Sequence, residues 1–205
     1  MTRKEEIIYA ALELAAEHGP GAVTLSRIAD RVGIKKPSLY NHFASKEELV
    51  KEMYAFLREQ AKTRNTAPPL PADFGDASLE EILLGAVRGY MGFLSDGDIL
   101  RFFKVLYSER STSPAAAQIM LEETEKMTAA TRSLFYALVV RGKMKNEDVD
   151  TAALCFAMAV HSLVDRQMDM MTAGTLGPED CTRVSAELEE LVRWFGRKME
   201  VGGNE

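Results

Sequence analysis

The sequence predicts an all-α protein of about nine helices, and two patterns support this fold class. Apolar residues recur at intervals of three and four along nearly the whole chain, whereas the period-two alternation typical of strands is rare. Residues that start and stop helices also stand where these apolar stretches begin and end. The chain has 205 residues, of which 46% are hydrophobic and 27% are charged, so it is long enough to bury a core and is neither disordered nor fibrous.

The first four predicted helices are short and closely spaced. They cover residues 3–18, 25–32, 36–43 and 46–62. Thr24 is a good N-cap for the second helix, and Pro37 stands in the first turn of the third, where a missing N–H does no harm. Ser45 and Glu48 have the spacing of a capping box, which predicts the start of the fourth helix.

A Pro-rich stretch at 63–77 separates these helices from a set of longer ones. The longer helices are expected over residues 78–94, 98–109, 113–141, 146–172 and 178–199. The sequence therefore predicts an N-terminal domain (1–48), a connecting fourth helix (46–62) and a larger helical domain (63–205).

Positive charge is concentrated near the N-terminus, although the net charge of the chain is −6. Residues 1–62 contain ten basic and nine acidic residues, whereas the remainder contains fifteen basic and twenty-two acidic residues. Within 24–46 five residues are basic and one is acidic. A small cationic patch on an acidic body favours specific docking on a polyanion over general adhesion to nucleic acid.

Several classes of protein are excluded by what the sequence lacks. The longest stretch nearly free of charge, residues 151–164, is too short to span a bilayer. The charged N-terminus does not resemble a signal peptide. The two cysteines, Cys155 and Cys181, form neither a metal-binding motif nor a disulfide framework. We expect a cytoplasmic protein with no membrane segment, no metal and no cofactor.

The second and third predicted helices have the spacing of a helix-turn-helix. The turn at Gly33 and Ile34 is too short for antiparallel packing, so the two helices must cross steeply. Opposite its apolar Leu39 and Phe43, the third helix presents mainly hydrogen-bond donors, which could enter a major groove. A solvated helix face in an ordinary bundle would show the same periodicity, so periodicity alone does not decide between the two.

Residues 24–49 resemble the DNA-binding signature of the TetR-type transcriptional regulators. The most specific parts are the Leu-Tyr-Asn-His-Phe sequence at 39–43 and the Ser-Lys-Glu sequence at 45–47. Detailed resemblance covers about residues 5–50, and the rest of the chain is similar only in length and helix pattern. The resemblance implies a homodimer that binds double-stranded operator DNA with an inverted repeat.

The same resemblance implies DNA contacts from eleven residues. These are Thr24, Ser26, Arg27, Lys35, Lys36, Pro37, Ser38, Tyr40, Asn41, His42 and Lys46. Lys36, Pro37 and Ser38 would face base edges, whereas Tyr40, His42 and Lys46 would bind phosphates. Lys35 is a departure, because many members have a small N-capping residue there, so we expect a weakly capped third helix.

The larger domain contains two helices that are candidates for a dimer interface. Residues 152–160 are apolar on nearly every side, which predicts a helix buried on two sides. The last helix has an apolar stripe that begins at Cys181. The predicted interface residues are Ala153, Ala157, Val160, Val184, Leu188, Leu191 and Phe195. Alternatively, both helices belong to the core of a monomer.

Methionines and aromatic residues of the larger domain are candidates for an effector pocket. The predicted lining residues are Tyr90, Phe93, Phe103, Tyr107, Met120, Met127, Met158, His161 and Asp165. Methionine adapts to irregular space, so such a pocket would suit a small and largely apolar molecule, although most of these residues could equally be ordinary core. The expectation of a ligand comes mainly from the resemblance.

The sequence offers little support for an enzyme. His161 and Asp165 share a helix face, but Ser162 is turned about 100° from His161, which is poor geometry for a base that activates a nucleophile. We therefore interpret the chain as a ligand-responsive transcriptional regulator, more specifically a repressor. The alternative is a helical enzyme or carrier of small molecules whose basic face is only solvated.

Overall fold

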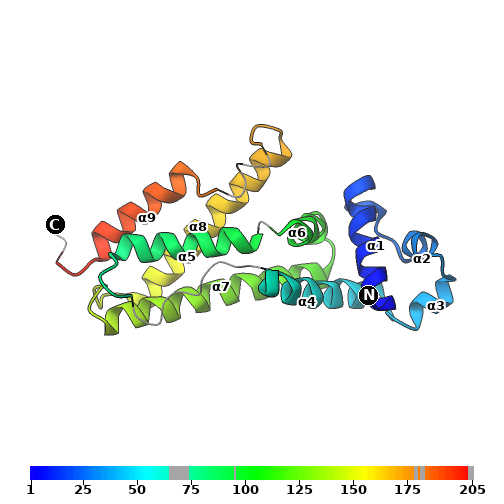
Figure 1. Cartoon of the computed structure of the whole chain (residues 1–205), viewed down its shortest axis with the longest axis horizontal. Coiled ribbons are helices and arrows are strands. Elements are labelled where there is room, and N and C mark those ends of the chain that lie inside the picture. Colours follow the sequence, from blue (N-terminus) through cyan, green and yellow to red (C-terminus); the bar gives the residue numbers. More distant parts are fainter. Residues whose placement is uncertain (65–73, 95, 178–179, 181–182, 203–205) are drawn as a thin grey trace. The chain divides into compact units, whose positions relative to one another are not determined.

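The computed structural model describes residues 1–64, 74–94, 96–177, 180 and 183–202. This part of the chain contains nine α-helices and no strand, which confirms the all-α prediction (Figure 1). The helices are α1 (Arg3–His18), α2 (Leu25–Val32), α3 (Lys36–Tyr40), α4 (Lys46–Arg64), α5 (Leu79–Leu94), α6 (Gly97–Glu109), α7 (Pro114–Val140), α8 (Val149–Thr172) and α9 (Ala186–Met199). None of the helices in these ranges is both long and apolar enough to cross a membrane.

The chain forms two compact units, which do not coincide with the division predicted at 63–77. The first unit comprises α1 to α4, α6, and α7 as far as Glu123. The second comprises α5, the remainder of α7, α8 and α9. The difference arises because α6 packs on α1 and α4, a pairing between distant segments that local sequence patterns do not reveal. Most of the Pro-rich stretch lies outside the described residues.

Side-chain caps define several helix starts as the sequence predicts. The Thr24 hydroxyl accepts a hydrogen bond from the Arg27 N–H at 3.3 Å, and the Ser45 hydroxyl accepts one from the Glu48 N–H at 3.1 Å. Ser78 and Glu81 form a reciprocal capping box for α5. These bonds satisfy amide groups that have no partner inside the helix.

Three helix boundaries differ from the prediction. Helix α3 ends at Tyr40 instead of residue 43, and α8 begins at Val149, after Asp148 in a left-handed conformation with φ 45°. Helix α9 begins at Ala186, where the Ser185 hydroxyl accepts a hydrogen bond from the Leu188 N–H at 3.3 Å. Both Pro178, where this helix was expected to begin, and Cys181 lie outside the described residues.

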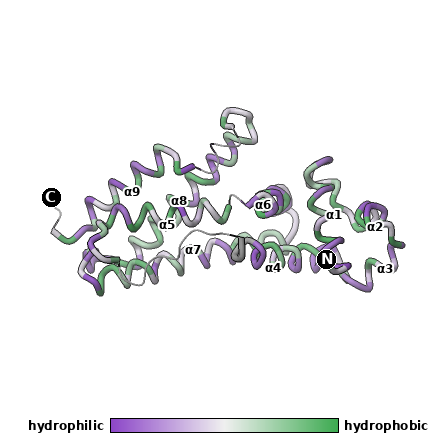
Figure 2. Tube along the Cα trace, viewed as in Figure 1, coloured by the Kyte–Doolittle hydropathy of each residue, from purple (hydrophilic) through white to green (hydrophobic). Residues whose placement is uncertain are grey.

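The first unit is held together by apolar side chains from α1, α2, α3, α4 and α6. Its fully buried side chains include Ile7, Leu12, Ile28, Leu39, Phe43, Leu49, Met53, Leu57 and Phe102. Burial of a large apolar side chain contributes about 1.5–3 kcal/mol to stability. The short helices α2 and α3 therefore depend on this shared core. Helix α2 contributes the buried Ile28 and Ala29 and also carries hydrophilic residues (Figure 2).

The second unit has its own core, centred on three phenylalanines. Phe135 of α7, Phe156 of α8 and Phe195 of α9 lie with ring centroids 5.0–5.6 Å apart. Leu79 and Leu83 of α5 are also buried in this core. Helices α5 and α9 pack side by side, and α9 also packs on α8 (Figure 1).

Candidate nucleic-acid interface

The eleven residues predicted to contact DNA lie at the surface of the first unit. Nine of them are exposed, and His42 and Lys46 are partly exposed. They belong to the start of α2, to α3 and its flanking residues, and to the first residue of α4. Folding thus leaves the whole predicted set at least partly exposed to solvent.

The turn between α2 and α3 is formed by a left-handed glycine. Gly33 has φ 72°, a left-handed backbone conformation that residues other than glycine seldom adopt. Its N–H bonds back to the last turn of α2, and the Ile34 N–H donates to the Ala29 carbonyl at 3.0 Å. These bonds end α2 abruptly and allow α3 to begin after three intervening residues, packed against α2.

Helix α3 has one buried side and one exposed side. Leu39 and the following Phe43 are both 0% exposed, so they anchor the helix in the core of the first unit. Lys36 and Ser38 are exposed, and the Tyr40 side chain is 44% exposed. Lys35 is the N-cap residue and makes no side-chain capping bond, which confirms the expected weak cap.

Not every basic residue of the predicted patch is available for DNA. The Arg31 guanidinium bonds to Glu17 at 2.5 Å and to Glu13 at 3.2 Å, both on α1. Hydrogen bonding to Arg31 holds the pKa of the Glu17 carboxyl below its ordinary value. Arg31 therefore fastens α2 to α1.

Lys46 is also paired, which the sequence did not reveal. Its Nζ lies 2.6 Å from Oε1 of Glu109, the last residue of α6. Both side chains are largely shielded, with relative exposures of 33% and 17%. The pair joins the first residue of α4 to the end of α6 within the first unit. Glu109 escapes local pattern analysis because it is 63 residues from its partner.

A second carboxylate holds α4 farther along its length. Glu123 of α7 accepts a hydrogen bond from the Tyr54 hydroxyl and forms an ion pair with Arg58. Burial, together with the bond to Glu123, raises the pKa of Tyr54, so its hydroxyl stays protonated. Glu109 and Glu123 thus bind α4 at two places.

The nine residues predicted to bind an effector are divided between the two units. Phe103, Tyr107 and Met120 belong to the first unit, and the other six belong to the second. Phe103 and Met120 are buried, and the Arg110 guanidinium lies 4.7 Å from the centre of the Tyr107 ring. Met158 is 42% exposed. The assignment of all nine residues to a single pocket therefore stays a prediction.

Three members of that set do come together. The Tyr90 hydroxyl lies 3.4 Å from Nδ1 of His161, and Nε2 of His161 lies 3.7 Å from Asp165. This row links α5 to α8 inside the second unit. Tyr90 and His161 are both partly buried, so their polar groups satisfy one another away from bulk solvent.

The residues predicted for a dimer interface require a correction. Five of the seven, namely Ala153, Ala157, Val160, Leu188 and Phe195, are buried inside the single chain, with relative exposures of 0–6%. They are core residues and have no surface to offer a partner. Val184 and Leu191 are partly exposed. The exposed apolar residues of α8 and α9 are instead Leu154, Met158 and Trp194.

In the described part of the chain, no three His, Cys, Asp or Glu side chains gather as a metal site requires. The surface around α3 is basic and rich in hydrogen-bond donors. It suits a polyanion with base edges to be read.

Comparison with known proteins agrees with this geometry. Residues 7–53 match the family described as bacterial regulatory proteins, tetR family, and residues 81–196 match the family described as AefR-like transcriptional repressor, C-terminal domain. The HTH-type transcriptional repressor KstR2 of Mycobacterium tuberculosis is 41% identical over 75 residues, which are 34% of this chain and 38% of that protein. The curated relative is thus matched over little more than a third of its length.

Two solved structures extend the likeness over the whole fold. A TetR family transcriptional regulator from Pseudomonas syringae pv. tomato is 26% identical with a TM-score of 0.63, covering 99% of this chain and 100% of that one. A regulator from Saccharomonospora viridis, in complex with choline, is 16% identical with a TM-score of 0.65, covering 96% and 97%. The alternative of an enzyme is not supported by any of these likenesses. Because the second family match alone spans more than half of the sequence, the chain belongs to the TetR family, whose members are transcriptional regulators and not enzymes.

Proposed function

We propose that this protein is a sequence-specific DNA-binding repressor that works as a homodimer and leaves its operator when a small, largely apolar molecule binds. The observation that carries the proposal is the exposed, donor-rich side of α3, anchored from behind by the buried Leu39 and Phe43. The name of the Mycobacterium tuberculosis relative, a transcriptional repressor, supports the direction of regulation. Since operator DNA lies in the bacterial cytoplasm, the proposal places the protein there.

The exposed residues divide into two roles. Lys36, Pro37 and Ser38 lie in the first turn of α3, which in this motif points into the major groove and meets base edges. Thr24, Tyr40 and His42 lie around this turn and can bond phosphates, which positions the protein without reading sequence. Arg27 and Lys35 add charge that favours both steps.

Lys46 has a competing partner. A phosphate at the start of α4 would be favoured by the helix dipole and by the lysine charge. The Glu109 carboxylate already occupies that lysine at 2.6 Å, so a phosphate must either share or displace it. Any free energy needed to break the Lys46–Glu109 pair is therefore subtracted from the free energy of DNA binding.

The surface best suited to a second copy of the chain lies on α8 and α9. Leu154 and Met158 are four residues apart on one face of α8, and they are 47% and 42% exposed. Trp194 of α9 is 50% exposed, and the two helices pack on each other. Exposed apolar side chains of this size favour a protein interface. A twofold dimer would require an inverted-repeat operator.

The proposed effector would bind in the second unit. Support comes from the choline complex of the Saccharomonospora viridis regulator, which has the same fold. Tyr90, His161 and Asp165 offer polar groups to such a molecule, in a unit that also has the partly buried Leu94 and Leu163 packed against its core. A ligand can change operator affinity only through its differential affinity for the two conformations of the protein.

Substitutions around α2 and α3 should distinguish residues that contact base edges from residues that contact phosphates. Lys36→Ala and Ser38→Ala should change the preference at particular base pairs, by about 1–3 kcal/mol where a bidentate hydrogen-bond pair to a base is removed. Thr24→Ala should weaken binding to all sequences alike, and Lys51→Ala, in an exposed lysine of α4, serves as the control. Fluorescence anisotropy with the upstream DNA and its single-base variants, at several salt concentrations, measures both effects. A uniform reduction in affinity for all three variants of the α2–α3 surface would contradict the division.

Removing the competitor of Lys46 should strengthen operator binding. Glu109→Gln frees the lysine for a phosphate, and we expect affinity to rise roughly two- to tenfold, the range of one modest ion pair. Glu122→Gln removes one negative charge from the same unit without touching Lys46, so it controls for the change in net charge. Equal affinities of the two variants in a titration at fixed salt would show that Lys46 makes no phosphate contact.

Charge on the exposed apolar face should dissociate the dimer. Leu154→Glu and Met158→Glu should shift sedimentation toward the monomer while the helical circular dichroism is retained, because both positions are exposed in the single chain. Val140→Glu, at an 83% exposed position of α7, should leave the dimer intact. Leu188→Glu should unfold the protein, since a buried unpaired charge costs several kcal/mol. Stable dimers in both α8 variants would place the interface elsewhere.

Operator and effector should weaken each other equally. If a molecule found by thermal-shift screening lowers operator affinity, the operator must lower the affinity for that molecule by the same factor, typically about 5- to 150-fold. Calorimetry with and without operator DNA measures the factor. Unrelated DNA of the same length is the control and should leave the ligand affinity unchanged. A ligand that binds equally well in the presence of operator would not be an effector.

A further inference from the structure

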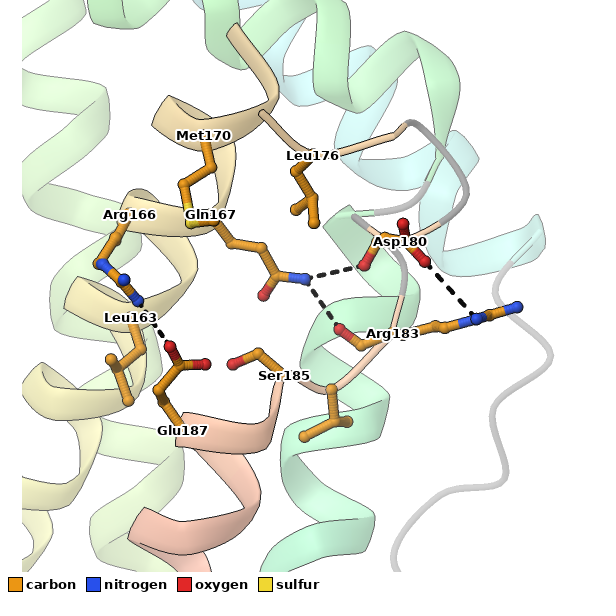
Figure 3. Close-up of a pocket in the computed structure, with 10 residues that line it drawn as sticks. Leu163, Arg166, Gln167, Met170, Leu176, Asp180, Arg183, Ser185 and Glu187 are labelled. Atoms are coloured by element: carbon orange, nitrogen blue, oxygen red, sulfur yellow. Dashed lines mark hydrogen bonds and ion pairs between the residues drawn. The ribbon is translucent and has the colours of Figure 1, made fainter. Parts of the chain in front are cut away.

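A pocket of about 250 Å³ lies between the C-terminal part of α8 and the start of α9, entirely within the second unit (Figure 3). None of the nine residues predicted for the effector lines it. Apolar walls come from Leu163 and Met170 of α8, from Leu176, and from Val184. Its volume exceeds the roughly 150 Å³ cavity that accommodates benzene in a protein core. A small organic molecule therefore fits.

The pocket contains one buried polar side chain, Gln167 of α8, which is 6% exposed. Its Nε2 donates to the backbone carbonyls of Asp180 and Arg183, at 2.9 Å in each case. The two bonds use both amide hydrogens and fix the orientation of the side chain, because a flipped amide would set its oxygen against two carbonyl oxygens.

The other polar atom of this amide lacks a partner. Oε1 of Gln167 is buried and accepts no hydrogen bond from any residue that the structure describes. Figure 3 shows it directed away from the two carbonyls, into the space bounded by Leu163, Ser185 and Glu187. Buried acceptors without donors are unusual in folded proteins. The unpaired oxygen thus points to a donor that comes from outside this part of the chain.

Charged side chains also line the pocket, but they neutralise one another. Arg166 bonds to Glu187 at 2.9 Å, and Arg183 lies 3.5 Å from Asp180. The bond from Arg166 holds the pKa of the Glu187 carboxyl below its ordinary value, so this pair stays ionised at neutral pH. Two positive and two negative charges leave no net charge to attract an ion.

We propose that this pocket binds a small neutral molecule with a compact apolar body and one hydrogen-bond donor, a hydroxyl or an amide N–H, directed at Oε1 of Gln167. The donor completes the hydrogen bonding of the buried amide, and the apolar body covers Leu163, Met170 and Leu176. A single water would satisfy the oxygen but would leave most of this apolar wall wet. Binding at this site goes beyond the proposed repressor function and does not depend on any response to DNA.

The test compares 4-ethylphenol with 4-ethylanisole, in which a methyl group replaces the hydroxyl hydrogen, on the full-length protein without DNA. Calorimetry and saturation-transfer NMR should show 4-ethylphenol binding at least about tenfold more tightly, because the ether leaves the buried oxygen unpaired. Leu176→Trp fills the pocket and should abolish binding of the phenol. Leu121→Trp adds the same side chain at a 59% exposed position outside the pocket and should preserve it.

Three results would overturn the proposal. Equal affinity for the two probes would show that Gln167 does not select a donor. Unchanged phenol binding in Leu176→Trp would place the bound molecule elsewhere. No saturable binding of the phenol at millimolar concentration would mean that water or a protein side chain occupies the site. Because no DNA is present, none of these outcomes bears on operator binding, and loss of operator binding alone would leave this site intact.

Discussion

Burial of Leu39 and Phe43 is the constraint on which the exposed, donor-rich surface of α3 depends. Helix α3 has only five residues, far fewer than an isolated helix needs to be stable in water, and its N-cap residue makes no side-chain bond. Its position therefore comes from these two anchors and from the left-handed turn at Gly33. The same anchors turn the polar residues outward, so the stability of the core and the exposure of these polar residues have one cause.

Ion pairs between helices also stabilise the arrangement of the first unit. Arg31 ties α2 to α1, Lys46 ties α4 to α6, and Arg58 ties α4 to α7. Each pair joins two different helices of the first unit. Partly shielded pairs of this kind hold geometry more than they add stability, since desolvation offsets much of their attraction.

The sequence predicts local features well and long-range partners poorly. The capping residues Thr24, Ser45 and Ser78 and the turn glycine Gly33 act through bonds to residues a few positions away, so their roles follow from spacing alone. The placement of α6 in the first unit and the Lys46–Glu109 pair depend on segments dozens of residues apart.

The burial of the predicted interface residues of α8 in the single chain has another reason, because residues 152–160 are apolar on nearly every side. Without polar positions, the sequence cannot show whether Ala153 and Ala157 or Leu154 and Met158 face the core. Only the packing of α8 against α9 and the phenylalanine cluster decides which side is buried.

Helices α8 and α9 are joined by backbone hydrogen bonds at one end and by side chains at the other. Beside the start of α8, Met144 and Glu200 form a backbone bridge, and the Lys145 N–H donates to the Met199 carbonyl at 2.7 Å. At the far end, the side-chain amide of Gln167 bonds to two loop carbonyls, and the side chain of Arg166 pairs with Glu187 of α9. Paired backbone is stiffer than links made by long side chains. Thermal fluctuation between the two helices should therefore be larger near residue 167 than near residue 149.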